Sequence, residues 1–187
     1  MKKNYLFKIA AMVAAGILFN NTVKAQTTKQ GEWRLGIGAE AALPVGDVSD
    51  ISSFVIGGTA RLQYATSDKV ALTFTSGYYD FIGKSFQAFT TTPSSVTTRT
   101  VRENFGLIPI KAGIKDFFGN NFYFGAEAGA AIQTGGSLSR NTSVKLDVAP
   151  AVGFACKDWD ISARYENMSG DGTISFVGLR AAYSFGL

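Results

Sequence analysis

Hydrophobic and polar residues alternate along most of the chain with a period of two residues. This is the period of a β-strand, whose successive side chains point to opposite faces of a sheet. No sustained helical periodicity follows residue 25. The alternation predicts eight strands, at residues 33–42, 54–65, 70–79, 105–117, 122–132, 144–155, 159–167 and 174–185.

The connections between these segments alternate in length. Short turns follow the second, fourth and sixth segments, whereas longer links span residues 43–53, 80–104 and 133–143. Short turns at one end and long loops at the other are typical of outer-membrane barrels, and each segment approaches the ~9–11 residues that a tilted strand needs to cross a bilayer. We therefore predict an all-β fold: an eight-stranded antiparallel up-and-down transmembrane β-barrel. Pro109 and Pro150 cannot donate to a ladder, and we interpret Pro150 as the mark of a β-bulge.

The two faces of the predicted strands differ in composition. One face is apolar, and we expect no charged residue to interrupt it, as on a surface that faces lipid. The opposite face carries Arg34, Glu40, Arg61, Lys111, Lys115, Glu127, Asp147, Asp160, Arg164, Glu166 and Arg180. Because eight strands enclose a space that side chains just fill, these nearly balanced charges are expected to pair across the lumen as a structural network.

Aromatic residues gather at the predicted periplasmic ends of the strands. Tyrosine and tryptophan favour the membrane–water interface, because one end of each side chain is apolar and the other polar. We expect an interfacial girdle of Trp33, Tyr64, Phe117, Phe118, Phe122, Trp159, Tyr183 and Phe185.

The first 25 residues have the features of a secretory signal peptide. A basic start precedes an apolar stretch at residues 9–19, and Val23 and Ala25 occupy the −3 and −1 positions. This stretch is shorter than the ~20 apolar residues of a transmembrane helix. We predict cleavage between Ala25 and Gln26, which divides the chain into a signal peptide, residues 1–25, and a barrel, residues 26–187.

The leader changes the interpretation of the net charge. The chain has 18 basic and 14 acidic residues, a formal charge of +4, but four of the basic residues lie in the leader. The remaining 162 residues are formally neutral, so the argument for a nucleic-acid partner disappears. The charged fraction of 17% is also below the ~25% of an ordinary soluble domain.

The sequence has no histidine and one cysteine. These counts exclude an internal disulfide framework, a cysteine-based zinc cluster, histidine-dependent catalysis and most transition-metal sites. Asp160 and Glu166 could in principle act as an acid–base pair, but six residues along a strand separate them by roughly 20 Å. We therefore predict no enzyme activity, no cofactor, and no catalytic, cofactor-binding or metal-ligating residues.

Three stretches carry a family resemblance. Residues 105–113 have an apolar-proline-apolar centre, residues 122–129 alternate with glycine after a tight turn, and the last strand carries Leu179, Ala181, Tyr183 and Phe185. The mature chain resembles the outer-membrane protein β-barrel domain family, the small eight-stranded barrels of OmpA/OmpX type. The resemblance implies location in a Gram-negative-type outer membrane and recognition of the last strand by the outer-membrane assembly machinery.

The link at residues 80–104 is the leading functional candidate. Nine of the sixteen residues from 85 to 100 are Ser or Thr, and long barrel loops are where function concentrates. We expect a non-enzymatic structural or surface-interaction role, with membrane lipid around the barrel and a surface protein or glycan at this loop. One alternative is a secreted or periplasmic lipocalin-like carrier of an apolar ligand, suggested by Gly31-Glu32-Trp33. The other is a narrow channel.

Overall fold

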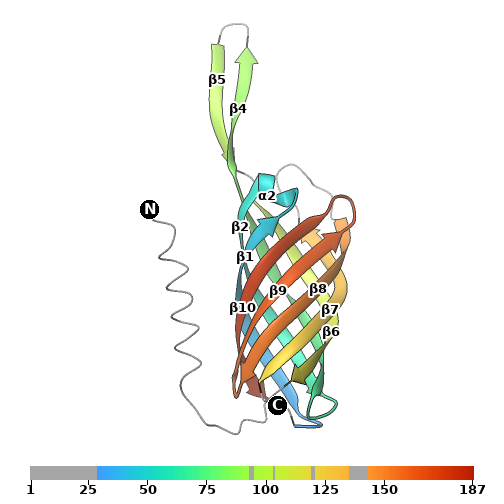
Figure 1. Cartoon of the computed structure of the whole chain (residues 1–187). Coiled ribbons are helices and arrows are strands. Elements are labelled where there is room, and N and C mark those ends of the chain that lie inside the picture. The colour runs from blue at the N-terminus through green and yellow to red at the C-terminus, as the bar shows by residue number, and fades with distance from the viewer. Residues whose placement is uncertain (1–28, 93–94, 103, 119–120, 135–142) are drawn as a thin grey trace.

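The computed structural model describes residues 29–92, 95–102, 104–118, 121–134 and 143–187. They form a closed barrel of eight antiparallel strands, in which each strand pairs with its neighbour in the chain and the last pairs with the first (Figure 1). The barrel strands are β1 (Trp33–Val45), β2 (Ser52–Ala65), β3 (Val70–Gly83), β6 (Phe105–Phe118), β7 (Phe122–Thr134), β8 (Ser143–Cys156), β9 (Trp159–Ser169) and β10 (Ile174–Gly186). The predicted eight-stranded up-and-down barrel is confirmed. The predicted signal peptide lies outside the described residues.

Most strands are longer than predicted at one end of the barrel. At the turn end their bounds agree with the alternation within one residue. At the loop end six of the eight strands extend further, by up to four residues in β3, whereas β6 and β10 begin where the alternation predicts. The interior of β3 is apolar at this end, where Tyr79 and Phe81 are buried. The inward positions are therefore apolar and the outward positions include Asp80, so the polar-inside, apolar-outside alternation that marks the strand disappears.

Residues 80–104 do not form the expected loop. After β3 ends at Gly83, β4 (Ser85–Thr92) and β5 (Ser95–Arg102) pair as an antiparallel hairpin that projects beyond the loop end of the barrel (Figure 1). The prediction failed because residues 85–102, rich in serine and threonine, lack the hydrophobic alternation of the barrel strands. A single helical turn, α2 (Val48–Ile51), lies at the same end.

The interior of the barrel is layered. On β6, the buried cations Lys111 and Lys115 lie between Leu107 towards the loops and Phe117 towards the turns. The loop-end layer is an apolar cluster of Ala42, Val48, Val55, Tyr79, Phe81, Leu107, Ala131, Met168, Ile174 and Phe176. The turn-end layer consists of Ala71, Phe117, Tyr123 and Ala155. Phe117, expected in the outer girdle, is thus inside. It lies an even number of residues from Lys111 and Lys115 along β6 and therefore on the same inward face.

The two strand prolines do not produce bulges. Pro150 continues the β7–β8 ladder without a register shift, and on its β9 side the pairing is interrupted beside Tyr165 and resumes in the same register. Pro109 does the same between β7 and β3. The bulge expected at Pro150 was wrong. A proline lacks only its N–H, so it interrupts bonding to one neighbour while the ladder to the other continues.

Glycines make room for two interior tyrosine rings. A Cβ atom built on Gly57 would lie 2.5 Å from the ring of Tyr79, its partner on β3, and one built on Gly153 would lie 2.3 Å from the ring of Tyr123 on β7. Both rings are buried. Glycine at these positions is therefore required by the close approach of an aromatic side chain.

Two glycines of β7 provide a matched test of this packing. A Cβ on Gly129 would lie 2.0 Å from the carbonyl oxygen of Ile110, whereas one on Gly125 would meet nothing closer than 3.5 Å. We expect Gly129→Ala to destabilise the barrel by about 1–3 kcal/mol through overpacking. Gly125→Ala should be neutral or stabilising by up to about 1 kcal/mol. Urea unfolding of both variants in phospholipid vesicles measures the difference, and equal stabilities would contradict the packing described.

Candidate functional site

Lys111 is the centre of the charged lumen. Its side chain is fully buried, and its ammonium nitrogen lies 2.8 Å from a carboxylate oxygen of Glu166, 3.7 Å from Asp147 and 3.9 Å from Glu127. These carboxylates come from three different strands, β7, β8 and β9. One cation thus links the side of the barrel formed by β6 to the three strands that follow it.

One arm of the network runs from Glu166 towards β1 and β10. Glu166 lies 3.0 Å from a guanidinium nitrogen of Arg164, which also forms an ion pair with Glu40. Arg180 lies 3.7 Å from the same Glu40 carboxylate. This arm connects β9 across the lumen to the two strands that close the barrel.

The other arm runs from Glu127 towards the turn end. Glu127 and Arg61 are 3.1 Å apart, Arg61 lies 4.0 Å from Asp160, and Asp160 forms an ion pair with Lys115. With the first arm, the contacts join five basic and five acidic side chains into one connected network. The network is formally neutral.

Hydroxyl groups donate hydrogen bonds to three of its five carboxylates. Glu127 accepts hydrogen bonds from Thr75 at 2.6 Å and Thr73 at 3.2 Å, and Asp160 accepts one from the Tyr123 hydroxyl at 2.7 Å. Glu40 accepts one from Thr59 at 2.9 Å. Sequence reasoning considered only charged residues and missed these hydroxyls, although they share the inward face with the charges.

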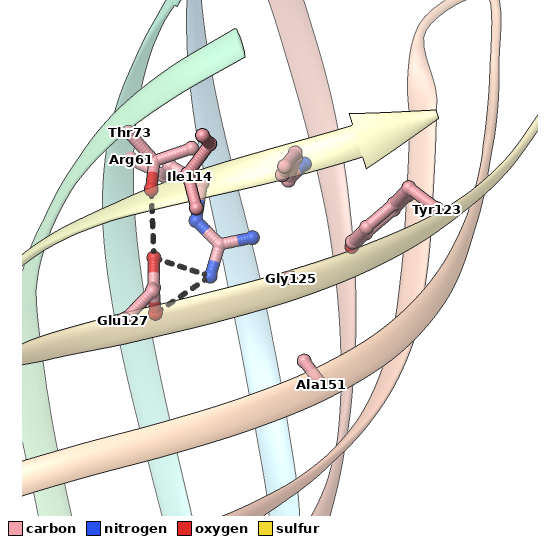
Figure 2. Close-up of a pocket in the computed structure, with 8 residues that line it drawn as sticks. Arg61, Thr73, Ile114, Tyr123, Gly125, Glu127 and Ala151 are labelled. Atoms are coloured by element: carbon pink, nitrogen blue, oxygen red, sulfur yellow. Dashed lines mark hydrogen bonds and ion pairs between the residues drawn. The ribbon is translucent and has the colours of Figure 1, made fainter. Parts of the chain in front are cut away.

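A small cavity adjoins the turn-end arm. Its volume is about 10 Å³, and the side chains of Arg61, Lys115 and Glu127 line it together with the small residues Gly125 and Ala151. Figure 2 shows Arg61 and Glu127 facing each other across this space, with Thr73 contacting the same carboxylate. A space of this size holds about one water molecule, so the lumen is filled by its own side chains here.

Arg34 and Lys145 differ from the sequence expectation. Arg34 does not join the network: at the turn end it lies 3.4 Å from Glu32 and 3.5 Å from Asp158, and it donates to the carbonyl of Lys157. Lys145, which the prediction omitted, is buried and donates to the carbonyls of Asp171 at 2.5 Å and Gly172 at 2.8 Å. Its position two residues before Asp147 was the signal that could have identified it. The other ten predicted lumen residues form the connected network.

The outer face of the barrel is apolar and exposed. Leu179, for example, is 61% exposed and Ile37 59%. At the turn end, Trp33 lies 4.7 Å from Tyr64 between ring centroids, and Tyr183 lies 5.5 Å from Trp159 and 4.9 Å from Phe185. The predicted interfacial residues other than Phe117 are on this outer face and at least partly exposed: Trp33, Tyr64, Phe118, Phe122, Trp159, Tyr183 and Phe185.

Two charged residues of the described barrel strands interrupt this face: Asp80 in β3, which pairs with the exposed Ile56 of β2, and Asp116 in β6. Asp116 is exposed on β6, on the same face as Ile114 and Phe118, and pairs with Val70 and Phe124 on the neighbouring strands. The expectation of an uninterrupted apolar face was therefore wrong at both positions. Asp116 lies two residues from the turn end of β6, where the aromatic residues gather, so its carboxylate is at the edge of the apolar surface.

The comparisons with known proteins identify the fold. No family model matches the chain, and no curated protein matches it. A solved structure of Ail, the attachment invasion locus protein of Yersinia pestis, is 14% identical, covers 83% of this chain and 99% of that chain, and gives a TM-score of 0.57. The fold is that of the small eight-stranded outer-membrane barrels.

Two further structures of the outer-membrane protein Ail support this assignment. Its backbone structure in a phospholipid bilayer nanodisc is 15% identical, with a TM-score of 0.53, and covers 83% of this chain and 100% of that chain. Its complex with the heparin analogue sucrose octasulfate is 17% identical, with a TM-score of 0.51 and coverages of 83% and 99%. At these identities the likeness to Ail shows the fold alone.

The described residues contain neither a metal-binding group nor a membrane-spanning helix. No three His, Cys, Asp or Glu side chains among them are grouped so that they could hold a metal ion. No helix in this part of the chain is long and apolar enough to cross a membrane.

The central lysine of this outer-membrane-type barrel provides a stability test. Lys111→Met leaves three carboxylates without their shared cation, so we expect a loss of about 3–5 kcal/mol in the free energy of unfolding. Adding Asp147→Asn should recover part of that loss, because Lys111 is the cation that faces Asp147. As a control, Lys157→Met removes an exposed lysine at the turn end and should cost less than about 1 kcal/mol. Equal losses for the two lysine variants, measured by urea unfolding in vesicles, would refute a supporting role for the network.

Proposed function

We propose that the chain is an integral outer-membrane protein with a closed lumen, without enzyme activity, that acts through surface interactions at its loop end. The observation that carries the proposal is the distribution of side chains across the wall: the outer face is apolar and exposed, whereas the interior holds a connected set of charges. If water surrounded the barrel, a polar outer face and an apolar interior would be favoured instead. Lipid as the surrounding solvent accounts for both faces.

The backbone supports a membrane setting in the same way. A barrel wall satisfies its N–H and C=O groups by pairing between strands, which a spanning structure needs because lipid offers no hydrogen bonds. The aromatic residues at the turn end support an interface there. In this setting the last strand, β10, is the segment that the assembly machinery would read, and the predicted signal peptide would deliver the chain to the periplasm.

The interior argues against the lipocalin-like alternative. A carrier of an apolar ligand needs an apolar lumen, but the centre of this one holds Lys111 with Asp147 and Glu166, all fully buried. Among the described residues, the apolar interior layers lie at the two ends, and they are filled by side chains such as Phe81 and Phe117. An apolar ligand would have to displace a connected ionic network.

The same layers support a closed lumen rather than a narrow channel. An ion crossing the barrel would have to pass the apolar cluster at the loop end, the ionic network and the apolar layer at the turn end. Val48 of α2 belongs to the loop-end cluster, so the mouth of the barrel is covered by an element outside the wall. Within the network the charges are ion-paired with one another.

The hairpin is the element best placed for surface interactions. It projects from the loop end (Figure 1), and its base is held by hydrogen bonds from Gly83 N–H to the Asn104 side chain at 3.0 Å and from Lys84 N–H to the Ile51 carbonyl at 2.8 Å. The similar barrel Ail has been solved with a heparin analogue. A protein or glycan at the cell surface is therefore the kind of partner that we propose.

A lysine on the outer face tests the membrane setting. Leu179, on the outer face of β10, and Ile51, in α2 at the loop end, are equally exposed, at 61% and 62%. In lipid, Leu179→Lys should cost about 2–4 kcal/mol if Leu179 lies near the midplane, whereas Ile51→Lys should be within about 0.5 kcal/mol of the parent. Unfolding in vesicles compares them. Equal, small effects would favour a soluble barrel.

Planar-bilayer recordings test the closed lumen. The purified barrel, inserted into a bilayer, should show no steady conductance, because the three interior layers leave no continuous aqueous path. A barrel of known conductance inserted under the same conditions serves as the positive control. Steady, reproducible conductance steps from the parent protein would favour the channel instead.

A further inference from the structure

The hairpin forms a sheet of its own with two open edges. In the described part of the chain, β4 pairs with β5 and neither pairs with another strand. The register is continuous from Ser85–Arg102 at the base to Thr92–Ser95 at the tip, without a bulge. Open edges of this length are templates for a further strand, and native proteins usually protect them with charges, prolines or bulges.

The edge of β4 lacks these protections. Its residues 85–92 include no charged residue and no proline, whereas β5 carries Arg99 and Arg102. Because Thr92 and Ser95 pair and are three positions apart in the sequence, they form a hydrogen-bonded pair, and alternate pairs down the ladder are non-hydrogen-bonded. The backbone N–H and C=O groups of Gln87, Phe89 and Thr91 therefore point away from β5 towards the open edge.

We propose that the β4 edge binds an extended polypeptide segment, which adds to the hairpin as a third strand. This inference rests on the proposed surface role and names the class of partner. Main-chain hydrogen bonds would supply the affinity, as in other cases of strand addition. The half-dozen backbone groups at the edge need only an extended partner strand to be satisfied.

The positions of the charges argue against a polyanionic glycan at this edge. Basic residues of the hairpin segment are Lys84, Arg99 and Arg102, and the register places all three in the half nearest the barrel. The outer half, residues 89–98, has no charged residue. A sulfated glycan would therefore find no cation along most of the hairpin.

Symmetry argues against a second copy of the chain. Two copies in one membrane hold their hairpins pointing the same way, related by an axis along the membrane normal. Their β4 edges would then meet in parallel with each N–H opposite the same N–H, whereas parallel pairing needs donors opposite acceptors. The edge is thus better suited to a different polypeptide.

Proline substitutions at the edge test the proposal. Gln87→Pro with Thr91→Pro removes two outward N–H groups and leaves the hydrogen bonds to β5 intact, and Gln87→Ala with Thr91→Ala removes the same side chains but keeps the N–H groups. The probe is a labelled twelve-residue peptide of alternating threonine and valine with two terminal glutamates, titrated onto the full-length barrel in vesicles. Unchanged heat-dependent gel mobility shows that each variant is folded.

We expect the peptide to bind the parent and the alanine variant within a factor of two, and the proline variant at least tenfold more weakly. Amide exchange at residues 87, 89 and 91 should slow when the peptide binds. Equal binding by both variants, or none by the parent, overturns the proposal. Binding of heparin but not peptide identifies a glycan partner, and self-association without peptide binding identifies a second copy; both outcomes also overturn it. Failure of protease to cut the hairpin on intact cells would instead refute the proposed surface role.

Discussion

The pairing of β10 with β1 is the constraint on which the rest of the structure depends. Once the sheet is closed, the wall has no open edge, and eight strands fix the width of the interior. That width leaves space for side chains and for little else. The inward residues must therefore fill the lumen and satisfy one another, while the outward residues are free to match the solvent that surrounds the wall. The opposite polarity of the two faces follows from this closure.

Charged side chains can fill such a lumen only as a connected set. An isolated buried charge is costly, and removal of one member leaves its partner uncompensated. Lys111 illustrates the solution, since one ammonium group faces carboxylates from three strands. The hydroxyls of Thr73, Thr75 and Tyr123 add hydrogen-bond donors to two carboxylates that also pair with cations. Apolar side chains fill the lumen at both ends of the ionic layer, where water would otherwise enter it.

The sequence could predict the parts of the fold that depend on this two-sided environment. The period of two residues predicted every barrel strand. It also predicted which ten charged residues of the network point inward, because lipid outside and charge inside impose opposite compositions on the two faces. Prediction failed where a strand lacks either the apolar outer face or the polar inner face. Tyr79 and Phe81 place apolar side chains inside the loop end of β3, where Asp80 lies on the outer face. Phe117 was assigned by residue type rather than by its place in the alternation, and Asp116 lies where the apolar face ends. Connectivity within the lumen, such as the separation of Arg34 from the network, depends on cross-barrel distances that no local pattern contains.

The hairpin lies outside the constraint of closure, and this explains both its composition and its significance. Strands β4 and β5 have neither lipid nor a lumen beside them, so threonine and serine can occupy both faces without loss. β-Branched residues and the hydrogen bonds at its base favour the extended ribbon. An isolated two-stranded hairpin is only marginally stable in water. A third strand along β4 would satisfy the outward backbone groups and stabilise the ribbon, so binding and ordering of the hairpin would favour each other.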